Sequence, residues 1–169
     1  NPEVLLPRST YNVDEMTVDP AGNLKWKTNG EQGILPFIVE QYRWNKWVTI
    51  GEVQGKGNDD VNSYSFSVTP HSGENTIRIA QVDHSGKKRP SNEVKFISTS
   101  PVVTKTPVKV KDEIKFLAGK SPYETRYEIY DAYGNIVKKG VGSSVNCSNL
   151  VRGVYYINFD NVNEKFIKN

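Results

Sequence analysis

The chain has 169 residues, of which 36% are hydrophobic and 24% charged, and its formal net charge is +3. Six Phe, nine Tyr and three Trp argue against intrinsic disorder, because aromatic side chains supply much of the buried area in small β domains. No apolar run reaches the ~20 residues that a transmembrane helix needs. The single cysteine excludes an intrachain disulfide, and the two histidines lack zinc-ligand spacing.

Alternation of apolar and polar residues with a period of two dominates the chain, and no helix is predicted. Turn residues such as Asn29-Gly30 and His84-Ser85-Gly86 separate the predicted strands of the first part. So many short strands in fewer than one hundred residues indicate a β-sandwich. The strands are predicted at 15–18, 23–28, 37–43, 47–53, 63–69, 75–83 and 92–97.

Several segments of this first part follow one another in a characteristic order. They are LKW, PFIVEQYRWNKW, NTIRIAQVDHSG and RPSNEVKF, and Leu24 and Trp26 share one face of their strand. In order and spacing, residues 10–98 resemble a fibronectin type III domain. The position of the tyrosine corner in that family holds Asn75 here, so a usual tether of the sandwich is absent.

A stretch rich in Ser, Thr and Pro, STSPVVTKTP, separates the two parts and is predicted to be a linker. We therefore expect two β-sandwich domains in tandem, in an all-β fold: residues 1–98, a linker at 99–106, and a smaller domain at 107–169. Residues 99–169 hold 11 Lys or Arg and 7 Asp or Glu, a net of +4. The strands of the second domain are predicted at 108–110, 113–117, 127–131, 136–139, 154–159 and 164–167.

The segment Arg126 to Gly140, RYEIYDAYGNIVKKG, reads as a hairpin with a turn at Gly134. Three ordered blocks run through the second domain: Y-x-I-Y-D-x-x-G-x-x-V, then S-x-L-x-x-G-x-Y, then a terminal K-x-x-K. In this order they resemble the type A C-terminal sorting domain of the type IX secretion system of Bacteroidota, over residues 106–169. The matching positions are Tyr127, Ile129, Tyr130, Asp131, Gly134, Val137, Ser148, Leu150, Gly153, Tyr155, Lys165 and Lys168.

The resemblance implies a small β-sandwich that directs export across the outer membrane and is bound by a shuttle β-barrel and the translocon. In cargo of this family, a cysteine-protease sortase usually removes the domain and attaches the cargo to lipopolysaccharide. The family usually opens with Tyr-Pro-Asn-Pro, whereas this chain has Lys105-Thr106-Pro107-Val108. This departure favours a domain that is retained in a component of the secretion or gliding machinery.

Most motif residues are expected to act through folding, since any hairpin uses such glycines and strand residues. Recognition is expected at the edge strands and at the final segment 165–169. The partner-binding candidates are Tyr130, Asp131, Gly134, Lys138, Lys139, Gly153, Lys165 and Lys168.

A second candidate surface is the aromatic cluster YRWNKW in the first domain. Tyr42, Trp44 and Lys46 would form a sugar-stacking or protein-binding platform. The competing interpretation, which we favour, places Trp47 in the core and exposes only Trp44 at the turn. No set of carboxylates or amides that would mark a sugar site stands beside the cluster.

The sequence predicts neither catalysis nor a cofactor or metal. Cys147 lacks a His partner and is expected to be a small buried residue. The start at Asn1-Pro2 instead of Met indicates a mature or trimmed product.

The prediction is thus a non-enzymatic binding protein of the type IX pathway, either cargo or retained component, exported and associated with the outer membrane or cell surface. Its expected partners are the shuttle β-barrel and the translocon, with other surface adhesins as further candidates. No nucleic acid and no transmembrane segment of its own are expected. The alternatives are a surface adhesin or carbohydrate-binding module, and accessory domains of a larger secreted hydrolase.

Overall fold

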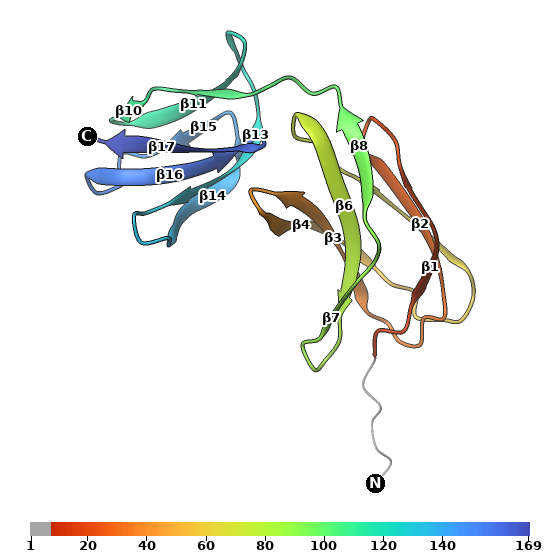
Figure 1. The fold of residues 1–169 in the computed structure, drawn as a ribbon. Coiled ribbons are helices and arrows are strands. Elements are labelled where there is room, and N and C mark those ends of the chain that lie inside the picture. Colours follow the sequence, from red (N-terminus) through yellow and green to blue (C-terminus); the bar gives the residue numbers. More distant parts are fainter. Residues whose placement is uncertain (1–7) are drawn as a thin grey trace. The chain divides into compact units, whose positions relative to one another are not determined.

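A computed structural model describes residues 8–169 (Figure 1), so the expectation drawn from Asn1-Pro2 lies outside the described residues. The described chain consists of strands and connecting turns, which confirms the predicted all-β fold. It divides into two compact units. Among the described residues, the N-terminal unit comprises residues 8–70 and Glu74–Ser98, and the C-terminal unit comprises His71–Gly73 and Thr99–Asn169.

The N-terminal unit contains a three-stranded and a five-stranded sheet. The smaller sheet has the order β1-β2-β5, and the larger has the order β4-β3-β6-β7 with β8 paired to β6. Asp19 and Gly22 close the turn between β1 and β2. The strands are β1 (Asn12–Val18), β2 (Asn23–Asn29), β3 (Pro36–Arg43), β4 (Lys46–Gln54), β5 (Asn62–Ser67), β6 (Gly73–Val82), β7 (Lys88–Pro90) and β8 (Val94–Ser98).

Inward-facing side chains of both sheets form the core of this unit. Trp26, on the face that the sequence predicts, is 1% exposed. Its ring lies 5.8 Å from that of Phe37 and 5.4 Å from that of Tyr64, and offset or edge-on aromatic pairs of this kind stabilise a core beyond their buried area. The aromatic rings therefore join β2, β3 and β5, as in a sandwich whose two sheets share one core.

Buried polar side chains form hydrogen bonds inside this unit, one pair at the position of the missing tyrosine corner and one group at Glu31. Asn75 accepts a hydrogen bond from Gln41 Nε2 at 2.8 Å. Elsewhere, Glu31, 2% exposed, accepts hydrogen bonds from the hydroxyls of Thr28 at 2.6 Å and Tyr64 at 2.8 Å. Burial by itself would raise the pKa of Glu31, but these hydrogen bonds outweigh it and hold the pKa below its ordinary value.

The C-terminal unit also contains two sheets. The larger has the order β10-β17-β16-β13-β14, and the smaller joins β12, β11 and β15, with β9 also paired to β11. β10 and β17 pair in parallel. The strands are β9 (Thr104–Thr106), β10 (Lys109–Val110), β11 (Glu113–Ala118), β12 (Ser121–Pro122), β13 (Thr125–Tyr130), β14 (Ile136–Gly142), β15 (Ser144–Asn146), β16 (Gly153–Phe159) and β17 (Val162–Lys168).

The core of the C-terminal unit is built from inward-facing residues of both sheets. Ile129 and Ile157 lie opposite each other on β13 and β16 and are fully buried. Phe116 of β11 packs against Phe159 of β16 with ring centroids 5.5 Å apart. The single cysteine, Cys147, is buried among them, as the sequence predicts.

Part of the predicted linker belongs to this unit. The sequence predicts a linker over 99–106, but Thr104–Thr106 form β9 and pair with Lys115–Leu117 of β11. Val103, also within the predicted linker, is 4% exposed and packs in the core. The linker prediction is therefore wrong over its last residues, because a strand of three residues is too short to show alternation.

Candidate functional site

The hairpin of β13 and β14 carries the first sorting motif. The Asp131 carboxylate accepts hydrogen bonds from the backbone N–H of Tyr133 and of Asn135, each at 2.9 Å, and from Asn135 Nδ2 at 3.1 Å. The bonds from Asn135 and Tyr133 lower the pKa of Asp131. Gly134 has a φ of 86°, which favours glycine. Both candidates therefore build the turn.

Tyr130 stands at the end of β13. It lies opposite Tyr156 on β16 and Ile136 on β14. Its side chain is half-buried, and its hydroxyl lies 3.1 Å from Glu128 Oε1, to which it donates a hydrogen bond. Tyr130 therefore combines a packing role in the hairpin with a position on the sheet face opposite the core.

Lys138 and Lys139 lie on β14, which pairs with β13 and is an edge strand of the larger sheet. Lys138 pairs with the core residue Ile129, and Lys139 pairs with Glu128. Because neighbouring residues of a strand point to opposite faces, the two ammonium groups lie on the two faces of the same edge. Lys138 is half-buried and Lys139 is exposed.

The second motif precedes and opens β16. Gly153 adopts a φ of 150°, and a Cβ added there would meet open space, so backbone conformation and not crowding favours glycine. The Tyr155 hydroxyl donates to the Val151 backbone carbonyl at 2.6 Å, and the ring of Tyr155 stacks on Phe166. This block therefore shapes the entry into β16.

The two lysines of the terminal motif differ in environment. Lys165 is exposed and lies opposite Tyr156. Lys168 is 7% exposed, and its ammonium group donates to the backbone carbonyl of Asn169 at 2.8 Å. Ile167 and Lys168 of the final segment lie inside the larger sheet, because both pair with β16 on one side and β10 on the other.

Cys147 lies in the core of the C-terminal unit. Burial raises the pKa of its thiol, which the nearby Lys138 and Lys168 only partly offset. Its Sγ lies 3.7 Å from the Val145 carbonyl oxygen. Across residues 8–169, His, Cys, Asp and Glu form no cluster of three or more that would hold a metal ion.

The aromatic cluster of the N-terminal unit divides between two faces. Tyr42, 43% exposed, lies opposite Trp47, with ring centroids 5.2 Å apart. Arg43 and Lys46 form the next pair and therefore lie on the other face. Trp44 is half-buried in the turn, where the Arg43 guanidinium lies 4.3 Å from its ring centroid. The platform of Tyr42, Trp44 and Lys46 is thus not a single surface.

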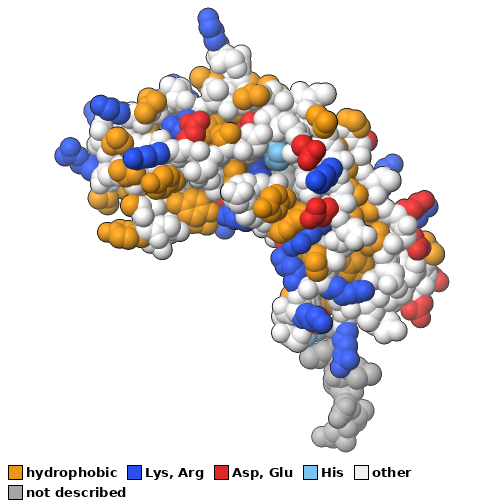
Figure 2. Space-filling view, viewed as in Figure 1, with side chains coloured by type: hydrophobic (Ala, Val, Ile, Leu, Met, Phe, Trp, Pro, Cys, Tyr) orange, Lys and Arg blue, Asp and Glu red, His pale blue; other side chains and the backbone are white. Residues whose placement is uncertain are grey.

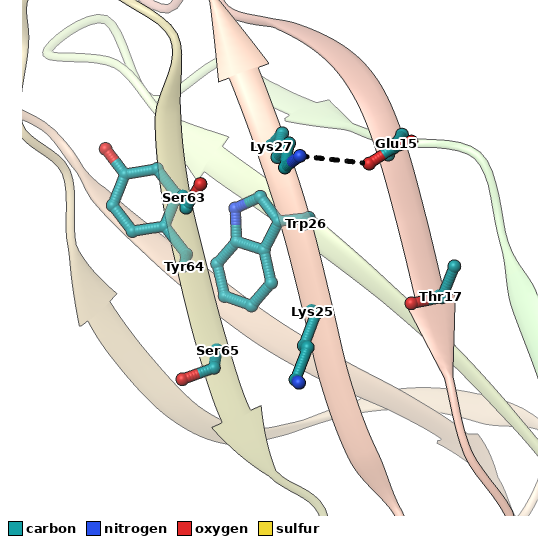
Figure 3. Close-up of a pocket in the computed structure, with 8 residues that line it drawn as sticks. All are labelled: Glu15, Thr17, Lys25, Trp26, Lys27, Ser63, Tyr64 and Ser65. Atoms are coloured by element: carbon teal, nitrogen blue, oxygen red, sulfur yellow. Dashed lines mark ion pairs between the residues drawn. The ribbon is translucent and has the colours of Figure 1, made fainter.

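A shallow hollow of about 390 Å³ lies over β1, β2 and β5, and the sequence offers no indication of it (Figure 3). Lys27 Nζ lies 3.4 Å from Glu15 Oε2 in an ion pair of two exposed side chains. Such a pair contributes little binding energy of its own. The hollow is lined by Glu15, Thr17, Lys25, Trp26, Lys27, Ser63, Tyr64 and Ser65.

Known proteins resemble this chain at two levels. Residues 104–169 match the family described as the secretion system C-terminal sorting domain. No curated protein matches the chain. Residues 8–169 contain no helix with the length and hydrophobicity that are needed to span a membrane.

Solved structures of low sequence identity also match. Dimeric latent PorU from Porphyromonas gingivalis is 12% identical, with a TM-score of 0.35 over 95% of this chain and 20% of PorU. A tetra-tandem repeat from the extending region of a large adhesion protein is 16% identical, with a TM-score of 0.36 over 94% of this chain and 46% of that chain. The fibronectin(III)-like modules of Clostridium thermocellum CbhA are 11% identical, with a TM-score of 0.32 over 94% of this chain and 93% of the modules. This chain thus spans less than two thirds of the length of PorU and of the adhesion-protein chain.

Proposed function

Because residues 104–169 are a type IX secretion system C-terminal sorting domain, which marks an exported protein, we propose that this chain acts by binding and without catalysis. Its C-terminal unit docks on the shuttle β-barrel and translocon at the outer membrane. The N-terminal unit, a fibronectin III-like sandwich, is carried to the cell surface by this route. The function rests on the site in the C-terminal unit and not on the sandwich fold, which supports many unrelated functions.

The single observation that carries this proposal is the sorting-domain match over residues 104–169. The geometry of the unit is compatible with it. Asp131, Gly134 and Gly153 build turns and the start of a strand, while Lys139 and Lys165 are exposed. The exposed lysines fit the net charge of +4 of residues 99–169 and would steer the unit toward an acidic partner.

We also propose that the domain is retained as a working part of the secretion or gliding machinery. The segment that replaces the usual opening block of the family is anchored in the unit. The Lys105 side chain is 2% exposed, and its ammonium group lies 3.7 Å from Glu164 Oε2 and 5.9 Å from the ring centroid of Phe166. A processing enzyme would have to displace this buried side chain to reach the segment.

Binding to purified shuttle barrel in detergent tests the docking proposal. The full chain should be captured by the immobilised barrel, and a chain truncated after Ser98 should not. Tryptophan fluorescence verifies that the truncated chain is folded, since the three Trp residues lie within residues 1–98. Equal capture of the two chains would show that the C-terminal unit does not carry the docking function.

The mass of the protein isolated from cells tests retention. A chain that still contains residues 104–169 at the cell surface is the expected result. Surface protein that lacks these residues would instead identify processed cargo, while leaving the docking proposal intact.

A surface adhesin or carbohydrate-binding module is a second candidate, favoured by the pair of Tyr42 and Trp47 on one sheet face. The Arg78 guanidinium lies 4.0 Å from the ring centroid of Trp47, beside the exposed Tyr42. Aromatic rings flanked by a cation are a common ligand platform. Glycan binding by the full chain that is lost in Tyr42→Ala would support this candidate, and unchanged binding would exclude this surface.

A further inference from the structure

The sheet edges of the C-terminal unit differ in length. In the larger sheet, one edge is the two-residue β10 and the other is β14, which spans Ile136–Gly142. In the smaller sheet, the edge strands β9, β12 and β15 each have two or three residues. Short edge strands limit pairing with other chains. Of the edge strands that the structure describes in this unit, β14 is the longest.

The side chains of β14 combine apolar surface with positive charge. Ile136 is 46% exposed, Val137 39% and Val141 52%. Lys138 and Lys139 lie between them, one on each face of the strand. Figure 2 shows hydrophobic side chains next to Lys or Arg side chains on the surface of the C-terminal unit.

Lysines on an edge strand commonly serve only to prevent aggregation. Here, however, exposed aliphatic residues flank the lysines at both ends of the strand, and these would themselves promote unspecific pairing. The charges decide which partner fits. Antiparallel pairing of β14 with a second copy centred on Lys139 would place like charges opposite each other, which is unfavourable. Acidic side chains at the same positions would form cross-strand ion pairs.

We propose that the open edge of β14 accepts an extended segment of a partner protein as an additional strand. The segment carries adjacent acidic residues opposite Lys138 and Lys139, with aliphatic residues on either side. Backbone hydrogen bonds along β14 supply the attachment, and the two lysines, on opposite faces, set the register. The identity of the partner as part of the outer-membrane machinery rests on the proposed function, whereas the chemistry of the edge does not.

The first experiment uses two capped synthetic peptides and the isotope-labelled full chain. One peptide is acetyl-Thr-Val-Glu-Glu-Val-Thr-amide, and its matched control has Lys-Lys in place of Glu-Glu. The glutamate peptide should shift the backbone amide NMR signals of Ile136–Gly142, and the lysine peptide should not. Shifts from neither peptide, equal shifts from both, or shifts confined to other strands would overturn the proposal.

A charge exchange tests the register. In the double variant Lys138→Glu and Lys139→Glu, affinity for the glutamate peptide should fall about tenfold, since two attractive cross-strand pairs become repulsive. The lysine peptide should bind in its place. The control variant Lys111→Glu and Lys120→Glu makes the same change of charge at exposed positions away from β14 and should keep the original preference. If the double variant fails to fold, the comparison of the two peptides on the unaltered chain still tests whether β14 prefers an acidic segment.

Hydrogen exchange with the purified shuttle barrel separates the two proposals. Protection of the β14 amides from exchange in the complex supports both the docking function and strand addition at β14. Binding with protection confined to β17 would overturn the β14 edge as the docking strand but leave the proposed function intact. Failure of the chain to bind the barrel would overturn the proposed function, while the peptide experiment would still decide on the chemistry of β14.

Discussion

Replacing Ile129 by Ala separates folding from recognition in the first sorting motif. Ile129 is fully buried in the core of the C-terminal unit and pairs with Ile157. Its truncation removes three carbon groups and leaves a cavity, at a cost of about 2–5 kcal/mol. A domain as small as residues 104–169 has roughly 3–10 kcal/mol of stability. The substitution should therefore remove much of the stability of the C-terminal unit.

The chain offers a separate probe for each unit. Cys147, the single cysteine, is buried in the core of the C-terminal unit, so its rate of thiol labelling reports the opening of that unit. Tryptophan fluorescence reports the N-terminal unit, since all Trp residues lie within 1–98. Ile129→Ala should accelerate Cys147 labelling by about 30-fold or more, because each 1.4 kcal/mol corresponds to a factor of ten. The urea transition seen by Trp fluorescence should not change.

Two control variants calibrate this result. Ile129→Val should cost about 0.5–1.5 kcal/mol and keep the unit folded and able to dock. Val151→Ala truncates an aliphatic residue that is 77% exposed and should leave the labelling rate within about threefold of the original. If Ile129→Ala abolished docking while Cys147 labelling stayed at the original rate, Ile129 would be a contact residue and the assignment to the core would be refuted.

Three further predictions concern single positions. Because the pKa of Glu31 is lowered in the folded state, its carboxylate stabilises the N-terminal unit at pH values above the ordinary Glu pKa of about 4.3. This contribution is lost as the pH falls through the lower, folded-state pKa. Urea melts at decreasing pH should show the loss, and Glu31→Gln should remove this pH dependence. Gly55→Ala should destabilise the same unit by about 1–3 kcal/mol in urea melts, since the new Cβ would overlap the Leu35 backbone carbonyl oxygen. Lys168→Glu should accelerate thiol labelling because it buries an acid in place of a largely buried lysine, whereas exposed Lys165→Glu should not.

Local pattern was sufficient to predict the long strands and the main turn. Alternation places Trp26 and Ile129 on inward faces, and both are buried. The residues Asp131 and Gly134 mark the turn between β13 and β14, because an Asp side chain accepts backbone hydrogen bonds and Gly adopts positive φ. These properties depend on neighbouring residues alone.

The very short strands were not predictable in this way. β7, β9, β12 and β15 have two or three residues each, too few for a period of two to appear. They form because a neighbouring strand offers backbone groups to pair with, as β11 does for β9. The end of the predicted linker was misassigned for this reason.

The sequence by itself determined that the chain is all-β and that its C-terminal part carries the ordered motifs of a sorting domain. Alternation and turn chemistry depend on neighbouring residues alone, so both can be predicted from the order of the residues. Only the tertiary structure decided which strand is an edge and which lysine is buried. Lys165 and Lys168 belong to one motif, yet pairing with β10 and packing near the core enclose Lys168 alone. Edges and burial depend on which distant strands lie beside a residue, and a local pattern does not contain that information.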